Sequence, residues 1–242
     1  MLSRLILKIH GDYDKRLGAY KITHILNRDY GIKVSVGRVY RLIQRLCLPT
    51  MSTSKPFIKA SKENYEDTKL CNHLKQEFNP PEPNMVWTSD FTYIKVNGVW
   101  SYLCIIMDLF SRKIISWNIS NKADCPLIMS TFNEAYNKRN CPTGLMFHSD
   151  CGAQYTAAPF RKLLDKFNVV QSFSKKGYPF DNACCESFFK YLKKEECYRK
   201  NYHSVGELKL SLFEYIEGFY NSRRPHYSLG FMTPNEKRIS IL

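Results

Sequence analysis

Three acidic residues stand out because of the segments in which they lie. Asp90 lies in a run of β-branched and aromatic residues, where a buried carboxylate is costly unless something compensates its charge. Asp150 follows a short apolar run, and Glu186 lies near the start of a predicted helix. Taken singly, each acid could be a helix cap or part of a surface ion pair. Three converging carboxylates need cations; their oxygens suit Mg²⁺ or Mn²⁺, and two such ions can support phosphoryl transfer.

The elements expected to position these acids are strands followed by alternating helices and strands. Asn97-Gly98 between the first two strand patterns is a hairpin signal. The expected strands are residues 85–96, 99–109, 113–119, 145–148 and 169–173, and the expected helices are residues 123–138, 157–167 and 183–198. This order predicts an α/β fold with a mixed five-stranded sheet and flanking helices. Asp90 and Asp150 can then lie on adjacent strands, with the last helix presenting Glu186.

A basic helical segment precedes the α/β region. Two amphipathic helical patterns lie in residues 18–47, and Ser35 is expected to cap the second helix. That helix carries Arg38, Arg41 and Arg45, which share one face because they are spaced by three and four. A helix-turn-helix with a basic second helix is typical of DNA binding, although many basic helical hairpins bind nothing. We therefore predict that these three arginines contact DNA.

The charge balance also favours a polyanionic partner. The 242 residues include 36 Lys+Arg and 22 Asp+Glu, which gives a net charge of +14, and residues 1–60 carry +9 of it. A hydrophobic fraction of 44% excludes a disordered polycation. The excess charge points to nucleic acid or, alternatively, serves only solubility. No apolar run approaches the ~20 residues of a membrane helix, so no membrane partner is expected. Nine scattered cysteines fit a reducing cytoplasm.

Prolines mark a domain boundary near the first predicted strand. Residues 79–84 contain three prolines, which neither continue a helix nor join a central strand. We expect four segments: a helix-turn-helix DNA-binding region at 1–50, a linker at 51–84, a catalytic α/β core at 85–200 and a C-terminal helical extension of the core at 201–242.

Four ordered stretches of sequence carry a more specific signal. They are WTSDFTY from Trp87, HSDCGAQY from His148, GYPFDNACCESFF from Gly177 and YNSRRPHYSLGFMTP from Tyr220. The first two acids are separated by 59 residues, and the second and third by 35. The four stretches and the second gap resemble the D,D,E catalytic core that OrfB-type insertion-sequence transposases share with retroviral integrases. The N-terminal segment also resembles the helix-turn-helix that these transposases carry before the core.

The resemblance implies an RNase H-like fold and a metal-dependent transposase. Asp90, Asp150 and Glu186 would be the catalytic metal ligands, for Mg²⁺ or Mn²⁺. In the family, water cuts the phosphodiester at the end of the element, and the freed 3′-OH attacks DNA in a transesterification. The implied partners are the terminal inverted repeats and the target DNA, a homodimer or higher assembly, and an upstream-frame (OrfA) partner or fusion. The implied location is the bacterial cytoplasm, with the nucleoid.

Further residues acquire expected roles beside the acids. Lys190, Lys193 and Lys194 follow the third acid by four, seven and eight residues, and integrase lysines at like spacing hold DNA. Lys175 and Lys176 lie in a loop expected to close on DNA. The residues expected to support the site rather than bind metal are His148, Gln154 and Asn182, and either Asp181 or Asn182 is expected to cap the following helix. Either contact with DNA or closure of the hydrophobic core is expected of three further residues, Arg223, Arg224 and His226, and the sequence leaves both roles open.

Two alternatives compete with a transposase. One is an RNase H-fold nuclease that only hydrolyses DNA. The other is a non-catalytic DNA-binding partner of a full-length transposase. The C-terminal Arg224-Pro225-His226 and the helix-turn-helix argue against the first, and the presence of all three acids argues against the second.

Overall fold

The computed structural model describes residues 1–49, 70–175 and 178–240. These residues form two compact units, which are described separately. The smaller unit contains the N-terminal helices and the loop Pro225–Phe231. The larger unit contains the sheet, its flanking helices and the last helix of the chain.

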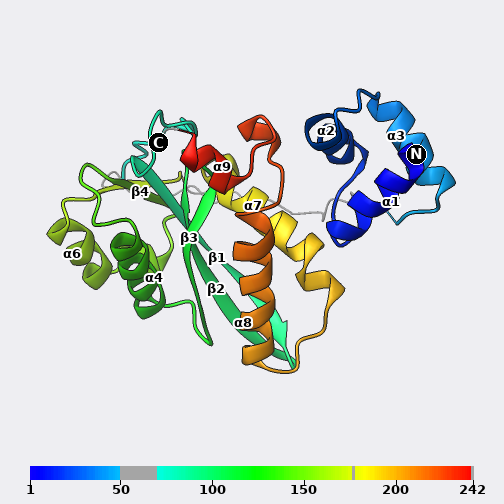
Figure 1. The fold of residues 1–242 in the computed structure, drawn as a ribbon. Coiled ribbons are helices and arrows are strands. Elements are labelled where there is room, and N and C mark those ends of the chain that lie inside the picture. The colour runs from blue at the N-terminus through cyan, green and yellow to red at the C-terminus, as the bar shows by residue number, and fades with distance from the viewer. Residues whose placement is uncertain (50–69, 176–177, 241–242) are drawn as a thin grey trace. The chain divides into compact units, whose positions relative to one another are not determined.

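The larger unit is built on a mixed five-stranded sheet, as predicted (Figure 1). Its strands are β1 (Val86–Val96), β2 (Val99–Asp108), β3 (Lys113–Ser120), β4 (Met146–Ser149) and β5 (Val170–Phe173). Their order is β3-β2-β1-β4-β5. The first three strands run antiparallel to their neighbours, whereas β4 is parallel to both β1 and β5. The strand that carries Asp90 therefore lies at the centre of the sheet.

The hairpin between β1 and β2 follows from its turn residues. Asn97 and Gly98 both have positive φ angles, 44° and 82°. A two-residue turn of this kind matches the twist of the flanking strands. Val96 consequently faces Val99, and the register continues from there to the pair Trp87 and Asp108.

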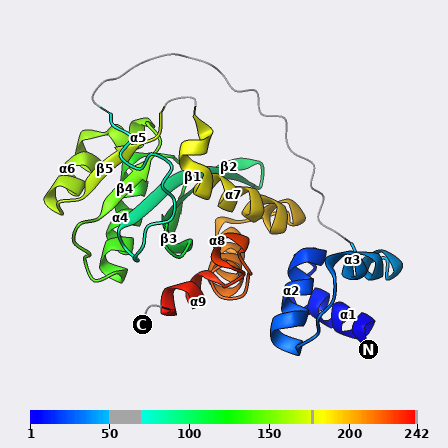
Figure 2. The same cartoon turned by 90° about the horizontal axis from the view of Figure 1, so that it is seen from above.

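Helices lie on both sides of the sheet (Figures 1 and 2). An aromatic core that includes Trp87, Phe132, Phe147 and Phe160 fills one side, against the first group of helices. That group is α4 (Cys125–Lys138), α5 (Ala153–Thr156) and α6 (Ala158–Lys166). The second group is α7 (Ala183–Glu195), α8 (Val205–Phe213) with a π-helical turn at Glu214–Tyr220, and α9 (Pro234–Ile239). The predicted helix at 183–198 thus ends at Glu195, where a 3₁₀ turn, Cys197–Arg199, follows.

The C-terminal residues are integral to the larger unit. The apolar residues Leu208, Leu212, Ile216 and Phe219 are buried. Beyond them, the Asn221 side chain accepts a hydrogen bond from the Ile114 backbone N–H and donates one to the Ile114 carbonyl, both at 3.0 Å. These two bonds join the C-terminal segment to β3.

A buried ion pair links this segment to the end of α7. Arg224 donates two hydrogen bonds to Glu195, from Nη2 to Oε1 at 2.8 Å and from Nε to Oε2 at 2.9 Å. Tyr215 adds its hydroxyl to Glu195 at 2.8 Å, and the guanidinium lies 4.0 Å from the centre of the Tyr191 ring. Burial lowers the pKa of Arg224, but the Glu195 carboxylate outweighs this and leaves it above its usual value. Arg224 therefore seals the core, whereas Arg223 is exposed.

Part of the predicted linker packs against the sheet. The backbone N–H of Phe173 donates to the Cys71 carbonyl at 3.0 Å, beside the outer strand β5. The N–H groups of His73 and Leu74 both donate to the Ser172 hydroxyl. Residues 71–74 thus cover the edge of β5, while residues 50–69 lie outside the described structure.

The smaller unit is a three-helix domain. Its helices are α1 (Leu2–Asp12), α2 (Ala19–Tyr30) and α3 (Val36–Arg45), and the second and third confirm the two predicted helices. Gly31 ends α2 with a left-handed φ of 64°, and the Ser35 side chain caps α3 by accepting the Arg38 N–H, as predicted. The apolar core between the helices includes Ile6, Ile22, Leu26, Val39 and Ile43.

Within the described part of the chain, none of the helices combines the length and the apolar character needed to cross a membrane.

The buried pair yields a stability prediction. Arg224→Met leaves Glu195 buried without its cation, and we expect the free energy of unfolding to fall by about 3–5 kcal/mol. The measurement is urea unfolding followed by tryptophan fluorescence, since all three tryptophans lie in the larger unit. Arg223→Met, at an exposed position, is the matched control and should change the value by less than about 0.5 kcal/mol. Equal effects of the two substitutions would contradict the assigned role.

Candidate active site

Asp90 lies where the central strand loses one neighbour. β4 pairs with β1 only from Val86 to Thr88. Among the described residues, β1 therefore has no ladder partner on that side from Ser89 to Lys95. Asp90 is half-buried at the start of this open edge, and it accepts the Phe91 backbone N–H at 2.7 Å.

The three predicted acids interact electrostatically. Burial, together with the negative charges of Asp150 and Glu186, raises the pKa of Asp90 to about 7. The Phe91 N–H and the Lys193 ammonium act in the opposite direction but do not offset the rise. Such effects require the acids and the lysine to lie near one another. The structure thus brings together residues from β1, the end of β4 and α7.

Asp150 is held in a tight turn directly after β4. Its Oδ1 accepts the Gly152 backbone N–H at 2.9 Å. A Cβ at Gly152 would stand 2.9 Å from that same oxygen and 2.5 Å from Nε2 of Gln154, so a side chain there would displace both groups. Burial raises the pKa of Asp150, whereas the Gly152 hydrogen bond lowers it. Gln154 thus lies beside the site, where it was expected to play a supporting part.

Glu186 is exposed in the first turn of α7, and partial burial raises its pKa. Within the described ranges, no three His, Cys, Asp or Glu side chains lie close enough together to enclose a metal ion. Asp90, Asp150 and Glu186 form an electrostatically coupled but open group, and their carboxylate oxygens are the donors that could hold a hard divalent cation.

The start of α7 is attached to β1 by Asn182. Its Oδ1 accepts the Thr88 hydroxyl at 2.6 Å, and its Nδ2 donates to the Ser89 carbonyl at 3.1 Å. The expectation that Asp181 or Asn182 caps the helix is wrong: Asn182 occupies the N-cap position, but no side-chain cap hydrogen bond forms. Its amide bonds to the sheet instead, because the Thr88 hydroxyl and the Ser89 carbonyl are buried polar groups that each require a hydrogen-bond partner.

Asp181 makes a second attachment, to the segments around β5. Its carboxylate accepts the side-chain amides of Asn72 and Gln76 at 2.9 and 2.8 Å, and the Lys175 backbone N–H at 2.9 Å. Its own backbone carbonyl accepts from Nε2 of His148 at 3.0 Å. Asp181 therefore joins the end of β4, the loop after β5 and residues 72–76 at one point.

His148 is a buried structural residue. The Asp181 carbonyl can only accept, so Nε2 carries the proton, and Nδ1 accepts the Ser172 hydroxyl at 2.9 Å. Ser172 in turn accepts the two backbone N–H groups near His73. Burial lowers the pKa of His148 to about 4 despite the Asp181 carbonyl, which raises it. The neutral imidazole supports the turn that positions Asp150.

The lysines of α7 differ in their exposure and in the rings that they lie against. Lys193 is half-buried, lies 4.6 Å from the centre of the Tyr93 ring, and interacts electrostatically with Asp90. Lys190 is exposed and lies 6.0 Å from the centre of the Tyr191 ring. In the preceding loop Lys175 is exposed; Lys176 lies outside the described residues.

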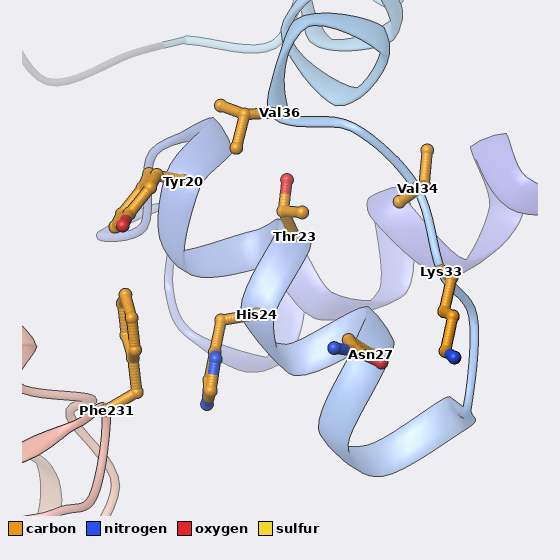
Figure 3. A pocket seen from close by; sticks show the side chains of 8 residues that line it. All are labelled: Tyr20, Thr23, His24, Asn27, Lys33, Val34, Val36 and Phe231. Carbon is orange, nitrogen blue, oxygen red and sulfur yellow. The ribbon is translucent and has the colours of Figure 1, made fainter.

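The smaller unit presents its arginines to solvent. Arg38, Arg41 and Arg45 are all exposed on α3. A hollow of about 250 Å³ lies between α2, residues 33–36 and the loop residue Phe231. Figure 3 shows Tyr20, His24 and Phe231 gathered at one end of it. The Phe231 ring stacks on His24 with centroids 4.1 Å apart. The hollow is smaller than most small-molecule sites.

Sequence comparison decides the family. The chain is 32% identical over 243 residues to the transposase for insertion sequence element IS904 of Lactococcus lactis subsp. lactis (strain IL1403), covering 98% of this chain and 92% of that protein. It is also 32% identical over 222 residues to transposase InsF for insertion sequence IS3A of Escherichia coli (strain K12), covering 92% of this chain and 76% of the relative. The chain belongs to the insertion-sequence transposases.

Family models and a solved structure agree with this transposase. Two models described as an integrase core domain match residues 80–179 and 168–234, and one described as an HTH-like domain matches residues 1–53. A chain of the simian T-cell lymphotropic virus intasome in complex with PP2A regulatory subunit B56 gamma has the same fold, with a TM-score of 0.53 and 14% identity over 96% of this chain and 74% of that one. The predicted integrase-like fold and DNA transposase function are confirmed.

Two groups of residues in the transposase site escaped the sequence reasoning. Thr88 and Asp181 fix α7 to the rest of the unit; Asp181 was expected only as a helix cap, and the one sequence signal of Thr88 is its place inside a family stretch. The exposed Tyr93 beside Lys193 gave no signal beyond the end of the first stretch. Their roles depend on partners distant in sequence.

The pKa of His148 gives the transposase a pH-dependent stability. A histidine whose pKa falls from 6.5 to about 4 on folding binds its proton more readily when unfolded, so stability is lost as the pH falls through this interval. We expect this residue to contribute a loss of about 3 kcal/mol between pH 6.5 and 4. The measurement is the free energy of unfolding in urea across that range.

The test compares how steeply the free energy of unfolding changes with pH in the wild type and in two variants. His148→Gln should lack this part of the pH dependence, whatever its stability at pH 7. His203→Gln, at an exposed position, should retain it. A wild-type slope in the His148 variant would contradict the buried neutral state.

Proposed function

We propose that Asp90, Asp150 and Glu186 are the catalytic metal ligands of this transposase and that they hold Mg²⁺ or Mn²⁺, as two ions. The observation that supports this is the pKa of Asp90, which the charges of the other two acids help raise to about 7. A carboxylate that two other acids destabilise gains from a shared cation, and a donor set made only of carboxylate oxygens suits these two metals.

The proposed reaction has two steps on DNA. Water cuts a phosphodiester at each end of the element, and the freed 3′-OH then attacks a phosphodiester of another DNA segment. Each step exchanges one P–O bond for another, so it requires no covalent intermediate with the protein. When bound, the ions supply Lewis-acid activation of the attacking oxygen and stabilise the leaving one.

The chain itself supplies position and charge. Asn182 and Asp181 fix the start of α7, so that Glu186 remains on the side of the sheet where Asp90 lies. Gly152 leaves room for the Asp150 carboxylate. The ammonium of Lys193, beside Asp90, is placed to bind a phosphate of the strand being cut.

DNA contacts are proposed for both units. Arg38, Arg41 and Arg45 on α3 would hold DNA through one exposed face, and the exposed Lys175 and Lys190, with Lys194 and Lys176, would hold phosphates near the acids. Two element ends must be cut and joined together, so we propose a homodimer or higher assembly on inverted repeats and target DNA. An upstream-frame (OrfA) partner or fusion fits the same proposal, as does a location with the bacterial nucleoid.

The acids are tested by substitution. We expect Asp90→Asn and Glu186→Gln to lower strand joining by at least about 100-fold, because each removes a ligand charge from ions that stabilise the transition state. The assay incubates labelled element-end DNA with target DNA and Mg²⁺ and measures cut and joined products. Asp165→Asn, at an exposed position on α6, is the control and should join at the wild-type rate.

The same assay separates the competing functions. Joining that persists in both acid variants would contradict the catalytic assignment. Cleavage by the wild type without a joined product would favour a nuclease that only hydrolyses. Binding without either product would favour a non-catalytic partner.

The arginines of α3 are tested by salt dependence. We expect Arg41→Gln to weaken duplex binding and to reduce the slope of log affinity against log salt by about 1, because one phosphate contact and its released counterion are lost. Fluorescence anisotropy at several salt concentrations measures this. Arg4→Gln, at an exposed position on α1, removes the same charge from another helix. An equal loss in both variants would indicate general attraction rather than a contact through α3.

A further inference from the structure

Four side chains form an exposed surface, of which only Lys193 also interacts with the acid group. Tyr93 and Lys95 lie on β1, Trp100 lies on β2, and Lys193 extends from α7. We call this set the aromatic ledge. Tyr93 and Trp100 are 54% and 48% exposed, although both are large enough to contribute greatly to a core.

The rings and the cations of the ledge lie in an ordered arrangement. Lys95 and Trp100 face each other in the β1–β2 register. The rings of Tyr93 and Trp100 meet edge to face, with centroids 5.0 Å apart and an interplanar angle of 83°. Lys193 Nζ lies 4.6 Å from the Tyr93 ring centre, and Lys95 Nζ lies 5.7 Å from that of Trp100. A cation thus flanks each ring.

Core packing does not explain this arrangement. Phe91 and Tyr102, which precede the ledge on the same sheet face, pack against the aromatic core. Beyond them the hairpin extends past α4, so that the next residues on this face have no helix over them (Figures 1 and 2). Large adjacent aromatic side chains left in water commonly mark an interaction site.

Lys193 links the ledge to the acid group, although the alternation of β1 places Tyr93 and Asp90 on opposite faces of the sheet. Lys193 contacts Tyr93 and also interacts electrostatically with Asp90. Between them β1 has its open edge, across which the side chain of Lys193 reaches from α7. A DNA strand bound at the acids would therefore reach the ledge by passing around this open edge along Lys193.

We propose that the aromatic ledge binds unpaired nucleotides of DNA, with bases stacked on Tyr93 and Trp100 and phosphates on Lys95 and Lys193. Exposed rings interleaved with cations suit single strands, whose bases offer free faces and whose backbone is anionic. Paired bases within a duplex hide those faces. The proposal rests on the proposed function in placing DNA at the acids. The new element of the proposal is that the DNA strand that leaves the acids is unpaired.

The experiment uses the full chain and needs neither metal nor reaction. The probe is a labelled ten-nucleotide oligothymidine, and a blunt duplex is the comparison. We expect Tyr93→Leu and Trp100→Leu to weaken oligothymidine binding by about 5- to 100-fold each, as loss of base stacking does elsewhere. Phe213→Leu, at a 56% exposed position on α8, should bind like the wild type.

Two further arms identify the source of the unpaired strand. One probe is a duplex with a three-nucleotide 3′ tail, which represents a frayed element end. The other is a duplex with a central three-nucleotide mismatch, which represents distorted target DNA. Preference for the tail assigns the ledge to the element end, and preference for the mismatch assigns it to the target. Oligothymidine should also quench the tryptophan fluorescence of the wild type and not that of Trp100→Leu, which retains the buried Trp87 and the partly buried Trp117.

Several outcomes would overturn the proposal. Wild-type binding of oligothymidine by both ledge variants would do so, as would an equal loss of blunt-duplex binding. A change of oligomeric state in the Trp100 variant, with DNA binding intact, would assign the ledge to contact between copies of the chain. None of these outcomes bears on strand joining, so failure here is distinguishable from failure of the acid assignment.

Discussion

The position of the third acid depends on buried hydrogen bonds from two adjacent side chains, Asp181 and Asn182. Asn182 bonds to β1 next to Asp90, and Asp181 bonds to segments around β5 and accepts from His148. Each bond satisfies a polar group that would be costly to bury alone. Because these groups lie on four different segments, the start of α7 is fixed only when the surrounding unit is folded. The geometry of the site is therefore a property of the whole larger unit.

The three acids, in contrast, lower the stability of the folded unit. Burial and the two neighbouring charges make ionisation of Asp90 unfavourable, so a group suited to catalysis reduces stability in the absence of a cation. Contacts far from the acids offset this loss of stability. The buried Arg224–Glu195 pair and the Asn221–Ile114 bonds anchor the far end of α7 and the C-terminal segment. Asn221 and Arg224, at the start of the family stretch from Tyr220, thus support the larger unit through packing.

The sequence predicted features that depend on local pattern. The five strands, the Asn97-Gly98 hairpin and the Ser35 cap follow from alternation, turn chemistry and capping, and the structure has all of them. It did not reveal α1, whose apolar positions are interrupted by charges, or α5, which has only 4 residues. The three acids were visible as a motif.

Side-chain partners far apart in sequence could not be predicted. Arg224 and Glu195 are 29 positions apart, and nothing local distinguishes a sealing arginine from one that meets DNA. Asn182 was expected to cap its own helix because local bonding is the commoner use of asparagine there. Its partner Thr88 lies 94 positions away, so only the tertiary fold reveals the choice.

The open edge of β1 has a consequence for solubility. An unpaired strand edge can recruit a strand from another molecule and start aggregation. Here the edge begins at Asp90, and the cations of Lys95 and Lys193 lie along it. Charged side chains at this edge thereby discourage sheet-to-sheet association between copies of the protein.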